Sequence, residues 1–281
     1  MELPPTRAAA PVSALIQAID WRQPWLAPLL PLLETVAAAD DWKQALTRIA
    51  GERGLHNHRG LPLQFVPQAA LPDGTPYESF ISASGCVPTR DNLHDFFNAL
   101  VWLTYPQIKR RLNELQADAI TRASVPGGHA GNGQRGKLRD AATLFDENAG
   151  LLICEDASLI AALRARKWRE VLWEQRGTFG RAWTIRLFGH ALMEKLGKPY
   201  MAITAHAFPV IVDTAFFDLR EPEQRHFLDE CVANALSERL EANRFTPLPV
   251  SGVPGWWANQ DIAFYEDSGV FRPARPVAGD Q

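Results

Sequence analysis

Two histidines and a glutamate in the second half of the chain have the spacing of metal ligands. His190 and Glu194 are four residues apart in a predicted helix, so their side chains point to one face. The helix stops at Gly197 and Pro199, and a tight turn there would let the following strand carry His206 back towards His190. Two imidazoles and one carboxylate can bind a divalent metal ion, and they can equally form a His–Glu–His hydrogen-bond cluster.

A second polar set lies on a predicted helix at residues 91–105. Its apolar stripe consists of Leu93, Phe96, Leu100 and Leu103. Asp91, His94, Asp95 and Asn98 share the adjoining face, and the far side is again apolar, so we expect this strip to be mostly buried. It either faces a cleft or forms an internal network. In a cleft, His94 is the leading candidate for a fourth ligand or a general base, and Asp95 could position water.

The acidic pair Asp146 and Glu147 precedes a short apolar segment that is predicted to be a buried strand. Paired carboxylates can hold Mg²⁺ or divide the roles of acid and base, and the same pair can be an exposed turn or a helix end. Arg90 and Arg139 are natural partners for these acids or for an anionic ligand. These residues complete the candidate site.

Several motifs and targeting signals are missing from the sequence. The Gly-rich segment 124–136 lacks the Lys-Ser/Thr ending of a phosphate-binding loop, so we predict a flexible connection there. There is no G-x-S-x-G motif for a serine nucleophile and no C-x-x-C pair. The three cysteines are widely spaced, which is typical of a reducing compartment. With no secretory signal and no apolar stretch long enough to span a bilayer, a cytoplasmic location is predicted.

Helices are the main elements that must position these residues. Further helices are expected at residues 12–19, 25–38, 42–53, 107–121 and 222–240, with two or three more between 157 and 196. Extended segments are expected at residues 63–66, 79–82, 151–154 and 200–212. Residues 138–148 fit either a helix or a strand that turns at the acidic pair.

This pattern predicts an α+β fold class, namely a helix-rich single domain with a small sheet and an irregular C-terminal wrap. The domain is expected to span residues 13–281, after a disordered or loosely packed N-terminus at residues 1–12. Trp256, Trp257, Phe264 and Phe271 lie in the tail, which must pack on the body because it would otherwise expose a large apolar patch.

Charge is distributed unevenly along a chain whose formal net charge is only −3. Residues 107–140 and 164–186 each carry seven Lys or Arg, against three and two acids respectively, and Trp168, Trp173 and Trp183 interleave the second stretch. Such a stretch can form a surface that stacks bases and binds phosphates. Residues 213–241 carry eight acids and three Arg, so a neutralising contact within the fold is the commoner outcome.

Four blocks of the sequence resemble a bacterial family known as domain of unknown function 3025. The first block is PTRDNLHDFFNAL at residues 88–100, and the second combines LRD at 138–140 with LFDEN at 144–148. The third combines GHAL at 189–192 with EKL at 194–196 and TAH at 204–206. The fourth combines GVPGW at 252–256 with FY at 264–265 and VFRP at 270–273. They cover most of the chain from residue 77 onwards. The resemblance implies no activity, substrate or cofactor.

Two hypotheses from different classes therefore remain open. As an enzyme, the protein would be a metal-dependent hydrolase with His190, Glu194 and His206 at the metal and with Arg90 and Arg139 binding an anionic substrate. As a non-enzymatic binding protein, it would use its basic, Trp-containing surface for nucleic acid or a phosphorylated ligand. The near-neutral net charge makes a small anionic ligand the preferred partner over nucleic acid, and no membrane partner is expected.

Overall fold

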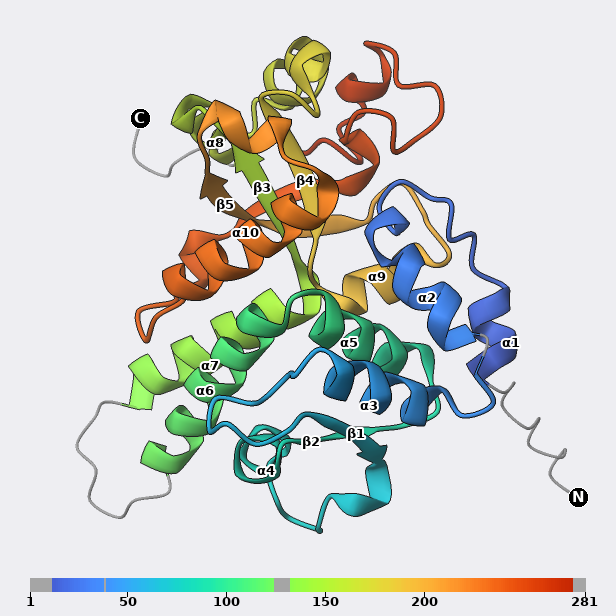
Figure 1. Ribbon diagram of the computed structural model, residues 1–281. Coiled ribbons are helices and arrows are strands. Elements are labelled where there is room, and N and C mark those ends of the chain that lie inside the picture. The colour runs from blue at the N-terminus through green and yellow to red at the C-terminus, as the bar shows by residue number, and fades with distance from the viewer. Residues whose placement is uncertain (1–11, 38, 124–131, 275–281) are drawn as a thin grey trace, which may run out of the picture.

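The computed structural model describes residues 12–37, 39–123 and 132–274 (Figure 1). The predicted N-terminal segment, apart from Val12, lies outside the described residues, as does most of the Gly-rich segment at residues 124–136. The described chain has a helix-rich α+β fold with two small sheets, which confirms the predicted fold class. No helix within these ranges is long and apolar enough to cross a lipid bilayer.

Helices and strands alternate irregularly along the chain. Among the described residues, the α-helices are α1 (Val12–Gln17), α2 (Leu30–Ala37), α3 (Trp42–Glu52), α4 (Tyr77–Ser84), α5 (Leu93–Thr104), α6 (Pro106–Ala123), α7 (Asn132–Asn148), α8 (Ala157–Arg164), α9 (His190–Leu196) and α10 (Glu221–Ala235). The strands are β1 (Gln64–Pro67), β2 (Cys86–Thr89), β3 (Ala149–Cys154), β4 (Trp183–Leu187), β5 (Thr204–Ile211) and β6 (Thr246–Pro249).

Side-chain caps fix where two of the predicted helices begin. The Asp41 carboxylate accepts hydrogen bonds from the N–H groups of Lys43 and Gln44 at the start of α3. Asn92 caps α5 by accepting from the N–H of Asp95, so this helix begins at Leu93. Asp91, which we predicted to lie on the helix, is therefore in the preceding loop.

The larger sheet has the strand order β4-β3-β5-β6. Strand β3 pairs antiparallel with β4 and parallel with β5, and β5 pairs antiparallel with β6. Every residue of β3 is buried, as expected for a short apolar strand at the centre of a sheet. Strands β1 and β2 form a separate parallel pair.

Helix α7 contacts strands β3 and β5 of the larger sheet, and α9 lies between α5 and this sheet (Figure 1). Helix α9 contacts both α5 and α7, while α6 contacts α4, α7 and α10. Ten of the twelve residues of α5 are buried, because apolar side chains occupy both of its flanks. The three helices α5, α7 and α9 thus meet at one place inside the fold.

The C-terminal segment packs on the body, as we predicted. Trp256, Tyr265 and Phe271 are buried in the same apolar core that contains Val12, and the Trp256 ring lies against the ring of Trp25. The single domain at residues 13–281 stays a prediction.

The structure corrects several predicted elements. Residues 79–82, expected to be extended, belong to α4, which packs on α6 and is followed by Gly85 with a left-handed φ of 75°. Strand β4 lies where we expected only helices, because its pairing with β3 joins residues far apart in sequence. Helix α10 ends at Ala235 rather than at residue 240. Residues 138–148 are helical, which decides between the two alternatives left open by the sequence.

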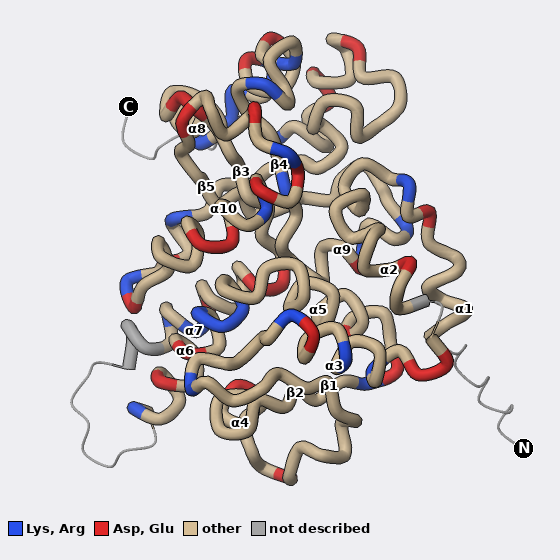
Figure 2. The backbone as a smooth tube through the Cα atoms, in the orientation of Figure 1, with Lys and Arg blue, Asp and Glu red and all other residues tan. Residues whose placement is uncertain are grey.

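Lys and Arg residues are interspersed with Asp and Glu residues over the described chain (Figure 2). Arg122 of α6 pairs with Glu238, which follows α10, at 2.8 Å, so a basic segment and the acidic one do contact each other. In the other basic segment, Trp168 and Trp183 are buried in the core. Those two indoles are therefore not available for the stacking surface that the sequence suggested.

Candidate metal centre

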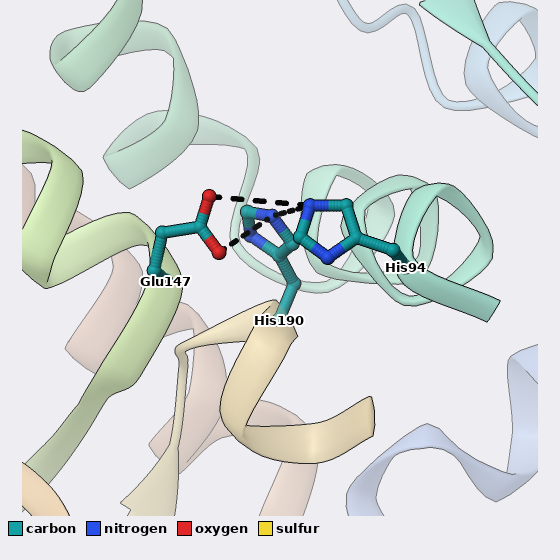
Figure 3. A group of neighbouring side chains, drawn as sticks. All are labelled: His94, Glu147 and His190. Carbon is teal, nitrogen blue, oxygen red and sulfur yellow. Dashed lines mark hydrogen bonds and ion pairs between the residues drawn. The ribbon is translucent and has the colours of Figure 1, made fainter. Parts of the chain in front are cut away.

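The ends of three helices bring two histidines and a glutamate together. His94 is in the first turn of α5, Glu147 is in the last turn of α7, and His190 is the first residue of α9. One ligand atom from each of these residues lies within 4.8 Å of the others. Figure 3 shows the three side chains pointing towards a common centre. His190 is buried, while His94 and Glu147 are partly exposed.

The distances within this cluster fit the ligands of a small divalent cation. The Nε2 atoms of His94 and His190 are 3.1 Å apart. Glu147 carboxylate oxygens lie 3.6 Å from the His190 Nε2 and 3.9 Å from the His94 Nε2. Tetrahedral coordination with bonds near 2.0–2.1 Å requires ligand atoms about 3.3 Å apart. Small side-chain movements would thus complete a three-ligand site with a fourth position open.

The outer ring nitrogens of both histidines face carboxylates. His94 Nδ1 lies 3.1 Å from Glu194 Oε2, and His190 Nδ1 lies 3.7 Å from Asp146 Oδ2. The second distance is too long for a hydrogen bond, and the buried Nδ1 of His190 has no hydrogen-bond partner of good geometry. A carboxylate behind each metal-binding imidazole is the usual arrangement in protein metal sites, because it fixes the tautomer and orients the ring.

A close backbone approach holds α9 against the end of α7. The N–H groups of Phe188 and Gly189 both donate to the carbonyl oxygen of Ala149, at 3.0 and 2.8 Å. A Cβ atom on Gly189 would lie 2.5 Å from the backbone nitrogen of Asn148, so only glycine fits at this position. The residue before His190 is therefore fixed against the residues that follow Glu147.

A buried ion pair supports the cluster from behind. Lys109 of α6 is 4% exposed, and its Nζ donates to both carboxylate oxygens of Asp146, at 2.6 and 2.8 Å. It also donates to Asn98 Oδ1 at 2.8 Å, and Asn98 Nδ2 donates to the Tyr77 hydroxyl at 3.1 Å. This chain of contacts holds the Asp146 carboxylate beside the ring of His190.

Burial and charge shift the pKa values around the cluster. Burial lowers the pKa of His190 to about 4, although the Asp146 carboxylate acts in the opposite direction. Burial also opposes ionisation of Asp146, but Lys109 and His190 outweigh it and lower the pKa of that carboxyl. Burial raises the pKa of Glu147. His190 is thus neutral near pH 7, and a neutral imidazole is the form that binds metals.

The cluster opens into a cavity of about 350 Å³. Its lining includes Gln68, Leu71, Tyr77, Glu78, Arg90, His94, Asp95, Asn98, Gln116, Thr143, Asp146, Glu147 and His190. Asp95 accepts two hydrogen bonds from the Arg90 guanidinium, at 3.1 and 2.9 Å, and one from the Arg90 backbone N–H at 2.6 Å. Asp95 therefore holds Arg90 at the cavity wall.

The predicted ligands are only partly brought together. Among the described residues, the grouped ligand atoms belong to His94, Glu147 and His190, which differs from the predicted set of His190, Glu194 and His206. The Glu194 carboxylate instead contacts the Nδ1 atom of His94. His206 lies in β5, paired with Ala149 and Pro247, and its ring is not among the grouped ligand atoms.

The remaining candidates divide between the cavity and the surface. Asp95, Asn98 and Asp146 are buried at the cavity, and Arg90 lines it. Asp91 instead pairs with Lys43 at 2.8 Å on the surface. Arg139 is exposed on α7 and does not line the cavity, so the structure separates it from Arg90.

Lys109 was not among the predicted site residues. It shares one face of α6 with Asn113 and Gln116, four and seven positions further on, and all three are buried. This polar strip beside an apolar stripe has the same pattern as the strip of α5, so the spacing carried a usable signal. Tyr77 and Glu78 had no such signal, because no helix was predicted at their position.

Comparison with known proteins adds a family but no function. A protein-family model described as "Protein of unknown function (DUF3025)" matches residues 63–275, which include every residue of the cluster. No curated protein and no solved structure matches the chain at a significant level.

Proposed function

Because the chain belongs to the family described as "Protein of unknown function (DUF3025)", which names no reaction, we propose a function from the chemistry of the site. His94, Glu147 and His190 bind a divalent metal ion, and the protein is a metal-dependent hydrolase that acts on an anionic substrate. Three protein ligands and an open fourth position are the arrangement of catalytic zinc sites, whereas structural sites have four protein ligands.

The observation that carries this proposal is the pair of facing Nε2 atoms at 3.1 Å. The Glu194 carboxylate requires a donor at His94 Nδ1, so the Nε2 of neutral His94 has a lone pair. If His190 carries its proton on Nδ1, beside Asp146, two lone pairs face each other. If the proton is on Nε2, the buried Nδ1 is left as an acceptor beside carboxylate oxygens. A cation between the Nε2 atoms removes this conflict.

The cavity supports hydrolysis rather than purely structural metal binding. A metal ion held by His94, Glu147 and His190 would act as a Lewis acid and would activate water for hydrolysis. His94 and Glu147 are partly exposed to the cavity, so a substrate can reach the open position. Glu194 orients the His94 imidazole, the Asp146 carboxylate lies beside the His190 imidazole, and Arg90 provides a positive charge within the same cavity.

Elemental analysis of the protein purified without an affinity tag tests the metal. We expect about one equivalent of a divalent metal in the wild type and a near-complete loss in His190→Ala and in Glu147→Gln. Chelator should lower the melting temperature of the wild type and leave both variants unchanged, because a ligand that binds only the folded state stabilises it.

His226→Ala is the matched control, because His226 is exposed on α10, where it pairs with Glu230 at 3.4 Å. It should retain the metal and the chelator effect. Near-zero metal in the wild type, with no uptake on adding Zn²⁺, Mn²⁺ or Fe²⁺, would overturn the proposal. The cluster would then be a hydrogen-bond network in which a doubly protonated His94 donates to both His190 and Glu194.

A further inference from the structure

Acidic residues outnumber basic ones on the wall of the cavity. Glu78, Asp95, Asp146 and Glu147 line it, and Arg90 is the only Lys or Arg among the described lining residues. Lys109 lies directly behind and neutralises Asp146. A metal dication together with these two side-chain cations balances the four carboxylates. The loaded cavity is thus close to neutral and has no excess of positive charge for a multiply charged anion.

Arg90 is held in a way that leaves one edge of its guanidinium unused by Asp95. Its Nε and one Nη2 hydrogen are directed to the Asp95 carboxylate. The opposite edge has two parallel N–H groups, a geometry that matches a carboxylate bidentately. The Arg90 side chain is 57% exposed although Asp95 is only 8% exposed, so much of this arginine remains open to solvent.

Arg90 and the cluster are close to each other in the fold. Arg90 is linked to Asp95, which is the neighbour of His94 on α5, and Glu194 lies near enough to Arg90 to stabilise its charge. A substrate in the cavity can therefore contact the guanidinium with one group while another group lies at the metal. The volume of about 350 Å³ is at the lower end of the range for small-molecule sites.

We propose that the substrate is a small molecule with a single carboxylate, that Arg90 binds this carboxylate bidentately, and that phosphorylated compounds are disfavoured by the acidic wall. This inference rests on the proposed function, since it assumes that the metal ion occupies the His94–Glu147–His190 cluster. It narrows an anionic substrate to a monocarboxylate and assigns the anion to Arg90 alone, without Arg139.

Binding of three small probes to the metal-loaded protein tests the inference. Isothermal titration with N-acetylglycine, N-acetylglycinamide and methyl phosphate compares a carboxylate, a neutral analogue and a dianion of similar size. We expect the wild type to bind N-acetylglycine at least tenfold more tightly than either of the others. Arg90→Gln should lose this preference, and Arg90→Lys should keep only part of it, because an ammonium retains the charge but not the planar fork.

Arg139→Gln is the matched control, because this arginine is exposed outside the cavity, and it should behave as the wild type. Metal content and the melting temperature of each sample are measured alongside. Equal binding of the acid and the amide, tighter binding of methyl phosphate, or an unchanged preference in folded Arg90→Gln would each overturn the inference. If metal is bound and the preference is absent, only this inference fails; if metal is absent, the proposed function fails first.

Discussion

Asn57 and the His94–His190 pair both bury polar atoms, but only one of the two regions satisfies them. Asn57 is 1% exposed, and its Nδ2 donates to the carbonyl oxygens of Ile81 and Ser82 at 2.8 and 2.9 Å. Its Oδ1 accepts from the N–H groups of Arg59 and Leu61 at 2.9 and 3.0 Å. At the histidine pair, two Nε2 atoms face each other and the buried Nδ1 of His190 has no hydrogen-bond partner of good geometry.

This difference separates polar residues that stabilise a fold from residues that await a ligand. Buried polar groups in folded proteins nearly always have hydrogen-bond partners, so an exception calls for an explanation. Asn57 joins α4 to the loop between α3 and β1 and needs nothing further. The histidine pair is complete only with an added proton or an added cation. Similar burial of Asn57 and of His190 thus has different meanings in the two regions.

The largest effect is expected from Lys109→Met, which tests the buried ion pair between Lys109 and Asp146 beside the histidine pair. The Asp146 carboxylate would remain buried without its partner, so we expect the free energy of unfolding to fall by about 3–5 kcal/mol. Urea denaturation measures this change. Lys167→Met is the control, since its ion pair with Glu170 is exposed and should be worth less than about 1 kcal/mol. Equal effects of the two changes would contradict the role given to Lys109.

Asn57→Ala tests the satisfied region. We expect it to lower the free energy of unfolding by about 3 kcal/mol, because it removes the side-chain partner of two backbone N–H groups and of two carbonyl oxygens, of which only that of Ile81 also accepts from Gly85 among the loop and cap bonds of the described residues. The loss should be the same with and without chelator. Asn234→Ala, at an exposed position of α10, should change stability by less than about 0.5 kcal/mol. If the loss of stability in Asn57→Ala depended on chelator, the claim that the Asn57 region is independent of the metal would be wrong.

Glu194→Gln tests the unsatisfied region at its edge. Glu194 orients His94 without being one of the grouped ligands, so its replacement should weaken metal binding by about 10- to 100-fold. That range corresponds to about 1.4–2.7 kcal/mol. Stability of the metal-free protein should hardly change, and competition with a chromophoric chelator measures the affinity.

A surface pair of the same residue types is available as the control. Glu230→Gln alters the exposed His226–Glu230 pair of α10 and should leave metal affinity unchanged. If the two substitutions weaken metal binding equally, or if neither weakens it, Glu194 does not orient a metal ligand.

The smallest effect concerns pH and a second satisfied position. Asp229 of α10 accepts from the N–H groups of Gln107 and Ile108 at the start of α6, yet burial raises its pKa to about 6. Because the folded state holds this proton more tightly than the unfolded state, its contribution to stability is complete below about pH 4. It is lost as the pH rises through 6.

The stability of the wild type relative to Asp229→Asn should therefore fall between about pH 4 and pH 6, by on the order of 1–2 kcal/mol. Urea denaturation across this pH range measures the difference. A relative stability that rises over the same range would mean that the two backbone N–H groups outweigh the cost of burial.

Local sequence patterns predicted the parts of this protein that depend on local interactions. The apolar stripe located α5, the helical pattern at residues 42–53 located α3, and the dense aromatic residues placed the C-terminal segment on the core. Strand β4 was not predicted, because its partner β3 is about thirty residues away and the intervening chain has helical features. Pairing at such a distance is decided by tertiary packing, which overrides local preference.

The candidate site was predicted residue by residue but not in its final grouping. His94, Glu147 and His190 were all candidates, each assigned to a different set. Spacing along one helix showed that His190 and Glu194 share a face, yet it could not show that α5 crosses α9 and α7 ends beside both. We predicted His206 as a partner of His190 only because we assumed a tight turn at Gly197 and Pro199. The packing of three helix ends, rather than any one motif, forms the cluster.

The contact between Gly189 and the start of β3 also bears on how the chain can change in length. The chain runs away from the site along β3 and returns along β4. The hydrogen bonds from the N–H groups of Phe188 and Gly189 to the Ala149 carbonyl hold together the two ends of the segment at residues 150–188. Insertions or deletions at its far end, around α8 and the following turns, would therefore leave Glu147 and His190 in register. In contrast, a single added methyl group at Gly189 would push Glu147 and His190 apart. The segment from β3 to α9 can therefore change in length at its far end, but it cannot accept a side chain at Gly189.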